Sequence, residues 1–240
     1  PMKHALFKAP LLFGHLVTIF PLLFCACGTS GGSEEDPELL RVIHAAPDVK
    51  EIEVVVGNEA PEGSDTTADT GRVNSSNSLT LRSEIVFGPL KYQSITEYSE
   101  VLEDTALPFV VKRPTSVGAL LSEEQTIGGG KTYTYIVYAE EDVVKSVLQE
   151  DDLDSPKEGK FRLRAAHFAA SQDAVDLYIY DTSSRLVDSE PAITALAFKS
   201  FSDGIEIDAG RYEIKFTATG TKDVIDDIGI LDQKAGNVLT

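Results

Sequence analysis

Two histidines are the residues best suited to acid–base or metal chemistry near neutral pH. His44 and His167 are the only histidines after residue 26. An imidazole can act near neutral pH as a general base or as a metal ligand. A zinc site usually takes three or four protein ligands, whereas each half of this chain supplies one histidine. We therefore expect each imidazole to hydrogen-bond backbone in the turn that follows it, where it fixes the exit of a strand.

The two histidines belong to two copies of one sequence pattern. The first copy is LRVIHAAPDVKEIEVVV, at residues 40–56, and the second is LRAAHFAASQDAVDLYI, at residues 163–179, which is 123 positions later. Further along, Tyr92 matches Phe198 at a spacing of 106, so the first copy carries an insertion of 17 residues. A repeat unit of roughly 110 to 120 residues is the size of a domain. The sequence therefore predicts tandem domains.

Four more residues complete the repeat signature around the histidines. Arg41 and Arg164 come three positions before the histidines, and each is expected to carry outward-facing charge or to pair with a neighbouring carboxylate. Pro47 and Asp48 follow the first histidine, whereas alanine and serine replace them in the second copy. We interpret this signature as structural and expect no catalytic residue and no metal ligand in it.

Clusters of aspartate raise the hypothesis of a calcium site, because Ca²⁺ takes several oxygen ligands held close together. The candidates are Asp65, Asp69, Asp151, Asp152, Asp154, Asp223, Asp226 and Asp227. None of them has the Asp-x-Asp-x-Asp-Gly spacing of an EF-hand loop. A solvated acidic surface is therefore the favoured interpretation, and no cofactor is expected.

Motifs of known enzyme families give no support for catalysis. The sequence contains no H-E-x-x-H motif, no P-loop and no dinucleotide-binding glycine pattern. An aromatic binding face is an open alternative, because alternating aromatic residues in strands either line such a face or pack a sheet. The tyrosines concerned are Tyr133, Tyr135, Tyr138, Tyr178 and Tyr180.

The first 26 residues have the pattern of an export signal. Lys3 and Lys8 precede the apolar run APLLFGHLVTIFPLLFCA, which glycine, histidine and proline interrupt. The end of the run resembles a bacterial lipobox, in which a small residue precedes a cysteine that is lipid-modified. Ala26 precedes Cys27, and no cysteine follows Cys27, so disulfides are excluded from the rest of the chain. An ordinary secretory peptide is the alternative.

Net charge limits the partners of the chain. The formal net charge is -18, and removal of the signal leaves 19 basic and 39 acidic residues, or -20. Such a surface repels phosphate backbones and anionic lipid headgroups. We therefore expect no nucleic-acid partner.

Apolar and polar residues alternate after residue 38, which is the period of β-strands. Ile52, Val54 and Val56 show this alternation, and no long helical period accompanies it. Short strands separated by turns predict an all-β fold, with an immunoglobulin-like or transthyretin-like β-sandwich in each repeat. The expected segments are a signal peptide at 1–26, a flexible tether at 27–38, a first sandwich at 39–150, an acidic linker at 151–160 and a second sandwich at 161–240.

Two stretches depart from a simple pair of repeats. Residues 58–80 contain almost no large apolar side chain, so we expect a surface loop there. The second copy reaches Thr240, which corresponds to Thr134, so it lacks counterparts of residues 135–138 and 143–148. A sandwich without these strands would expose an edge and an apolar face. We therefore expect the natural protein to continue.

The block RVIHAAPD, from Arg41 to Asp48, resembles the domain-of-unknown-function family 4397 when taken with the alternating strand that follows it. The segment FKSFSDGIEIDAG, at residues 198–210, fits the same family. The resemblance implies tandem β-sandwich domains in exported bacterial proteins, often lipoproteins. It implies no activity.

These observations favour a non-enzymatic lipoprotein of the bacterial cell envelope, anchored through Cys27 in the outer membrane or at the cell surface. Its expected role is adhesion, scaffolding or ligand binding, with an envelope protein or glycan as partner. The first alternative is a carbohydrate-binding module that uses outward tyrosines. The second is a hydrolase of an envelope polymer, with carboxylates as catalysts.

Overall fold

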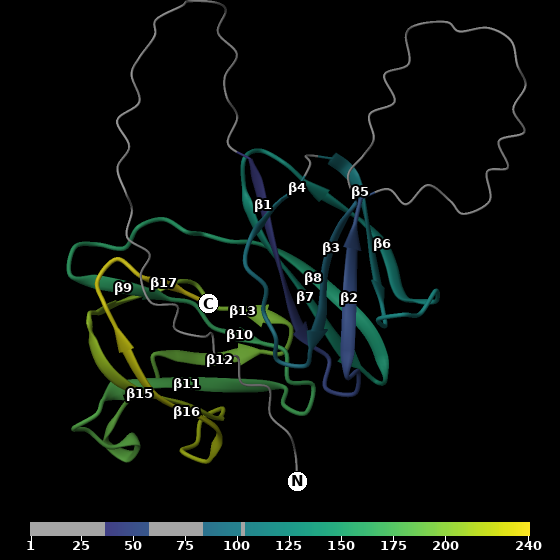
Figure 1. Cartoon of the computed structure of the whole chain (residues 1–240). Helices are drawn as coiled ribbons and strands as arrows, with labels where there is room; N and C mark the ends of the chain where they lie inside the picture. Colours follow the sequence, from purple (N-terminus) through teal and green to yellow (C-terminus); the bar gives the residue numbers. More distant parts are fainter. Residues whose placement is uncertain (1–36, 58–83, 102–103) are drawn as a thin grey trace, which may run out of the picture.

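The computed structural model describes residues 37–57, 84–101 and 104–240 as β-strands joined by turns and loops (Figure 1). One short 3-10 helix, η1 (Leu186–Asp188), is the only helix in these ranges. The prediction of an all-β sandwich fold is confirmed. Within the same ranges, no helix is long and apolar enough to cross a membrane. The signal peptide, Cys27 and the whole of the expected surface loop at 58–80 lie outside the described residues.

The first repeat forms two four-stranded sheets that face each other (Figure 1). One sheet has the order β4 (Ser99–Val101), β1 (Glu38–Ala45), β7 (Thr132–Glu140) and β8 (Val143–Glu150). The other has the order β3 (Ile85–Lys91), β2 (Glu51–Val56), β5 (Asp104–Lys112) and β6 (Ala119–Ile127). Strands β1 and β7 run parallel. Strand β1 begins at Glu38, one residue before the sandwich was expected to start.

The second repeat has the same plan with a divided first sheet. Its four-stranded sheet has the order β12 (Ile193–Ala197), β11 (Ala174–Asp181), β15 (Gly210–Ala218) and β16 (Val224–Gln233). A three-stranded sheet has the order β14 (Ile205–Asp208), β9 (Lys160–Leu163) and β17 (Val238–Leu239). A two-stranded sheet joins β10 (Ala166–His167) to β13 (Ser200–Phe201).

The pairing register shows that the two repeats share one fold. In the first repeat, Leu40 of β1 pairs with Tyr133 of the parallel strand β7. In the second, Leu163 of β9 pairs with Leu239 of the parallel strand β17. The two leucines at 40 and 163 are 123 positions apart, and their partners are 106 apart. The sequence spacings are therefore the spacings of equivalent residues in space.

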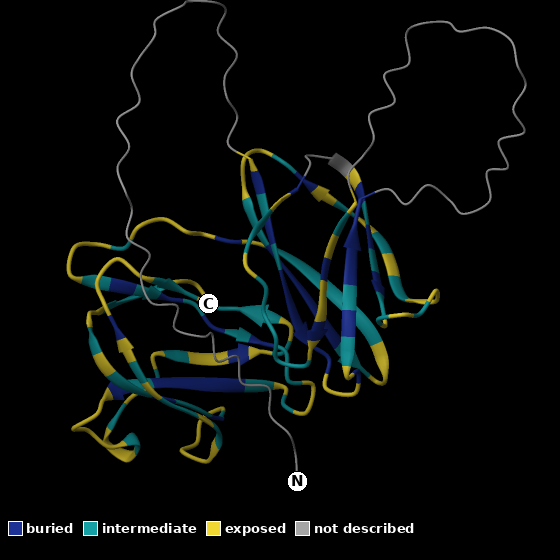
Figure 2. Ribbon diagram, viewed as in Figure 1, coloured by how far each residue is buried: buried dark blue, intermediate teal, exposed yellow. Residues whose placement is uncertain are grey.

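Strand β2 is the centre of the first core. Ile52, Val54 and Val56 point from it into the sandwich and are at most 1% exposed, as the dark blue of β2 in Figure 2 shows. Phe109 of β5 and Tyr135 of β7 pack across the same core, with ring centroids 4.6 Å apart. Burying one such side chain contributes about 1.5–3 kcal/mol, so this alternating strand stabilises the fold strongly.

The corresponding strand β11 differs from its sequence pattern. The alternation predicts an outward polar face carrying Asp176, Tyr178 and Tyr180, but all three side chains are buried. The Asp176 carboxylate accepts the backbone N–H of Ala195 in β12 at 2.7 Å and that of Gly220, in the turn between β15 and β16, at 2.8 Å. The Lys222 ammonium lies 4.2 Å from the ring centroid of Tyr178. The predicted outward face is wrong, because strand β12 and the turn between β15 and β16 lie against it.

A glycine allows a close approach between β2 and β3. Gly88 has a φ of +131°, and a Cβ at this position would lie 2.9 Å from the carbonyl oxygen of Ile52. The pairing register shifts here, between Ile52 and Val54. A side chain would therefore strain the backbone and separate the two strands.

Candidate functional site

Arg41 and Arg164, equivalent residues of the two repeats, meet at one carboxylate between the sandwiches. Asp151 follows directly after β8. Its Oδ2 lies 3.8 Å from Nη2 of Arg41, and its Oδ1 lies 3.7 Å from Nη1 of Arg164. The carboxylate side chain is 2% exposed, and the arginine side chains are 15% and 16% exposed. One buried negative charge therefore lies between two positive charges from different repeats.

Hydrogen bonds hold Asp151 against the first sandwich. The Tyr98 hydroxyl donates to Oδ2 at 2.9 Å, and the Thr134 hydroxyl also donates to Oδ2. Arg41 Nε donates to Thr134 Oγ1 at 2.8 Å and closes the network. Burial raises the pKa of Tyr98 well above its usual value, so its hydroxyl stays protonated as a donor. Oδ1 accepts no hydrogen bond from the described residues and has the ion pair with Arg164.

Each arginine also lies over an aromatic ring. The guanidinium of Arg41 is 4.7 Å from the ring centroid of Tyr98, and that of Arg164 is 4.6 Å from the ring centroid of Phe201. Arg164 further donates to two backbone carbonyl oxygens, at 3.2 and 3.4 Å. Of the two alternatives expected for these arginines, outward-facing charge or a pair with a carboxylate, the structure has the second. They pair with Asp151 because the interface between the repeats encloses them.

An apolar cluster, here called the junction patch, lies in the same interface. Its buried residues are Ile43 and Ala45 of β1 and Ile136 and Tyr138 of β7, and Phe168, Phe198 and Phe201 of the second sandwich pack against them. The ring centroid of Tyr138 lies 5.4 Å from that of Phe168 and 6.0 Å from that of Phe198. Beside these rings, Lys199 donates to Glu140 at 2.9 Å. The two repeats are therefore joined by apolar packing as well as by charge.

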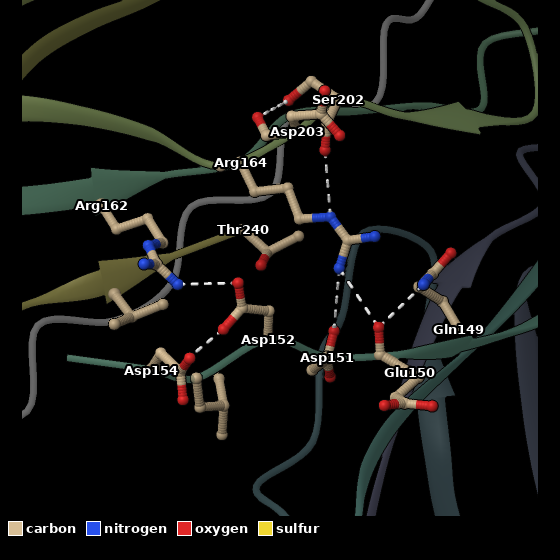
Figure 3. A pocket seen from close by; sticks show the side chains of 13 residues that line it. Gln149, Glu150, Asp151, Asp152, Asp154, Arg162, Arg164, Ser202, Asp203 and Thr240 are labelled. Carbon is tan, nitrogen blue, oxygen red and sulfur yellow. Dashed lines mark hydrogen bonds and ion pairs between the residues drawn. The ribbon is translucent and has the colours of Figure 1, made fainter. Parts of the chain in front are cut away.

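A pocket of about 620 Å³ opens at this interface (Figure 3). Its wall includes Arg162, Arg164, Asp151, Asp152, Ser202 and Thr240. Arg162 Nη1 donates to Asp152 Oδ2 at 2.7 Å, as Figure 3 shows. Donors and acceptors both line the pocket, so a ligand here would need both kinds of group.

His44 and His167 occupy equivalent turns, and backbone groups engage both nitrogens of each ring. His44 Nδ1 accepts the N–H of Ala46 at 3.3 Å, and Nε2 lies 2.8 Å from the carbonyl oxygen of Val49. The corresponding distances at His167 are 3.4 and 3.1 Å. We assign the neutral tautomer with hydrogen on Nε2, since Nδ1 accepts. Burial lowers the pKa of both histidines, which also favours the neutral ring.

The remaining signature residues, Pro47 and Asp48, lie exposed in the turn after β1. The hypothesis of an outward aromatic face is wrong for four of its five tyrosines, because they are at most 7% exposed. These four are Tyr135, Tyr138, Tyr178 and Tyr180. Tyr133 is half-buried, and its hydroxyl donates to the carbonyl oxygen of Gly128 at 3.1 Å.

The acidic clusters do not converge where the structure describes them. In residues 37–57, 84–101 and 104–240, no group of three or more His, Cys, Asp or Glu side chains is arranged to hold a metal ion. Asp152 and Asp227 each pair with a basic side chain, at 2.7 and 2.9 Å. The candidates Asp65 and Asp69 lie outside the described residues.

Comparison with known proteins identifies the family. Residues 38–178 match the family model described as "Domain of unknown function (DUF4397)". The chain belongs to this family. No curated protein matches the chain. The DUF4397 match runs from β1 into β11, so it contains both arginines, both histidines and Asp151.

Asp151 is the central residue of the junction that sequence reasoning missed. It was assigned to an acidic linker together with Asp152 and Asp154, which have the same side chain and neighbouring positions. The available signal was indirect. Two equivalent arginines, one in each repeat, are expected to pair with carboxylates. A carboxylate between the last strand of one repeat and the first strand of the next can lie close to both arginines.

Proposed function

We propose that this DUF4397 protein is a non-enzymatic lipoprotein of the bacterial cell envelope that serves as a scaffold, adhesion or ligand-binding module. The observation that carries the proposal is the junction between the repeats. Domains joined by small, polar contacts move relative to one another, whereas apolar packing around a buried ion pair resists such motion. Two sandwiches held in one orientation suit the presentation of a binding surface to a partner.

The state of the histidines supports a non-enzymatic role. A general base must reach the proton that it removes, through a nitrogen that is free to accept it. In His44 and His167, Nδ1 accepts a backbone N–H, and Nε2 carries its own hydrogen toward a carbonyl oxygen. These imidazoles therefore stabilise turns. Turnover of any envelope polymer by the purified protein would contradict this part of the proposal.

The carbohydrate-binding alternative loses its original basis, because it relied on outward tyrosines that are buried. A partner search is the direct test of the binding role. Crosslinking on intact cells that display the protein is expected to capture one protein or glycan reproducibly. Display at the surface without any reproducible partner would contradict adhesion and ligand binding.

The anchor is proposed from the sequence around Cys27. Lipid on this cysteine would hold the sandwiches at the membrane, and Gly28 gives no evident signal for retention in the inner membrane, which favours the outer membrane or cell surface. Cys27→Ala is expected to abolish lipid labelling and release the protein from membranes, whereas Cys25→Ala, the matched control, should leave both unchanged. A Cys27→Ala protein that stays membrane-bound with an unchanged mature mass would show that this residue is not lipidated.

A further inference from the structure

Each histidine lies directly before a residue of the junction patch. Ala45 follows His44 in β1 and is 2% exposed. Phe168 follows His167 of β10, and its ring centroid lies 5.5 Å from that of Phe201, another patch residue. A change in the backbone after either histidine therefore changes the interface between the two sandwiches.

In both turns the imidazole holds the backbone beside the patch residue. Nδ1 of His44 accepts the N–H of Ala46, and Nδ1 of His167 accepts that of Ala169. The patch residue thus lies between each ring and the group that the ring binds. A protonated imidazole carries hydrogen on both nitrogens and accepts no hydrogen bond. Protonation would therefore place two hydrogens against each other at Nδ1, and the residue after the histidine would have to move.

The His167 ring also contacts a second segment that lies at the junction. It meets the ring of Phe198 edge to face, with centroids 5.9 Å apart, and the His167 carbonyl oxygen accepts the N–H of Lys199 at 2.8 Å. Phe198 and Lys199 are the residues that contact Tyr138 and Glu140 of the first sandwich. Both segments around this histidine therefore form part of the junction.

The equivalent contact of the His44 ring is with Tyr92, at a centroid distance of 6.1 Å. Burial and, next, the charge of Asp226 in β16 raise the pKa of Tyr92. Tyr92 therefore lies within reach of a charge on the second sandwich, and the surroundings of His44 also extend to the junction.

The closed junction offers neither ring a compensating negative charge. Burial lowers the pKa of both histidines, and the opposing contribution comes from a backbone carbonyl oxygen, that of Val49 or Gln172. The titratable side chains on the surrounding described segments contribute nothing to either shift. They are Asp48, Lys50, Tyr92 and Asp226 near His44, and Asp173, Lys199 and Glu140 near His167. A charged imidazole is therefore disfavoured as long as the junction encloses it.

We propose that the junction is an acid-sensitive switch, in which protonation of His44 and His167 moves the turns after them and releases the second sandwich from the first. Histidine in water has a pKa of about 6.5, so below that pH the open form binds protons that the closed form resists. The junction is closed at neutral pH and opens as the pH falls below about 6.5, and each histidine favours the open form by up to ~10-fold per pH unit. The inference goes beyond the proposed function, because it concerns the orientation of the sandwiches and holds whatever partner they bind.

Zero-length crosslinking measures the closed junction directly. A water-soluble carbodiimide joins a carboxylate to an amine in contact with it, and Glu140 contacts two lysines. Lys199 lies across the junction at 2.9 Å, and Lys145 lies within the first sandwich at 2.5 Å. Mass spectrometry of the digested protein gives both crosslinks, and the one to Lys145 is the internal reference. We expect the ratio of the Lys199 crosslink to the Lys145 crosslink to fall at least ~3-fold between about pH 7 and pH 5, with unchanged circular dichroism.

A double variant with His44→Gln and His167→Gln keeps neutral side chains at both positions, so its crosslink ratio should stay constant over the same pH range. An equal fall in the double variant would assign the effect to other groups and overturn the proposal, as would a constant ratio in the unchanged protein. A fall accompanied by loss of the circular dichroism signal would mean that a sandwich unfolds and is not released. If the double variant does not fold, solution X-ray scattering of the unchanged protein decides. Release increases the radius of gyration, so an unchanged radius over this pH range would exclude the switch.

Discussion

Replacement of Asp151 by alanine tests whether the junction depends on burial of this carboxylate. The variant removes the acceptor of the hydrogen bonds from Tyr98 and Thr134 and leaves Arg41 and Arg164 without their shared counter-ion. Removing one partner of a buried pair costs about 3–5 kcal/mol. The N–O distances of 3.8 and 3.7 Å are long, and both arginines keep some contact with water, so the lower end of that range applies. We expect Asp151→Ala to lower the free energy of unfolding by about 3 kcal/mol.

The neighbouring Asp152 provides the control. It has a shorter contact, 2.7 Å to Arg162, but its side chain is 63% exposed. Exposed ion pairs contribute about 0–1 kcal/mol, so Asp152→Ala should change the free energy of unfolding by less than about 1 kcal/mol. Urea unfolding followed by circular dichroism measures both variants and suits a chain without tryptophan. Equal losses in the two variants, or a larger loss at Asp152, would refute the argument that burial outweighs distance here.

Burial lowers the pKa of His44 and His167 below the usual 6.5, so the unfolded chain takes up these protons first as the pH falls. The free energy of unfolding should therefore decline as the pH drops from about 6.5 toward 5.5. In urea unfolding, a double variant with His44→Gln and His167→Gln should lose less of this free energy over the same pH range. Tyr138→Ala removes a ring from the junction patch and should lower the free energy of unfolding by about 3 kcal/mol. Calorimetry of this variant should show separate transitions for the two sandwiches, whereas the unchanged protein should show a single transition. Gly88→Ala should lower the free energy of unfolding in urea by about 2–4 kcal/mol, because its Cβ would lie 2.9 Å from a backbone oxygen. Gly118→Ala is the control: its Cβ would lie 3.8 Å from the nearest atom, so the free energy of unfolding should change by less than about 0.5 kcal/mol.

The fold was predictable because its signals are local. The alternation of Ile52, Val54 and Val56 places a strand with one face in the core, and the repeat spacings place the same strand again 123 residues later. The outward face of β11 was not predictable in this way. Asp176 and Tyr178 alternate like exposed residues, but the distant turn between β15 and β16 covers them and supplies a backbone N–H to Asp176. Alternation reports two faces of a strand and does not report what later packs on the second face.

The junction was harder to predict for a different reason. It joins Arg41, Arg164 and Asp151, which are up to 123 positions apart in sequence, and the position equivalent to Asp151 in the second copy falls after Thr240. A pattern found by comparing the two copies can identify the arginines, which occur in both. It cannot identify Asp151, for which the sequence offers no second position to compare and whose neighbour Asp152 has the same side chain in contact with solvent.

The same contacts change where the first domain ends. A boundary between residues 150 and 151 would separate Asp151 from Tyr98 and Thr134, the side chains that hold its Oδ2. Its backbone belongs to the first sandwich as well, because the Asp151 N–H donates to the carbonyl oxygen of Thr132 in β7 at 2.8 Å. The other oxygen, Oδ1, faces Arg164 of the second sandwich. Asp151 is therefore bound to the first sandwich through its backbone and Oδ2 and contacts the second through Oδ1, so we expect the orientation of the two repeats to depend on it.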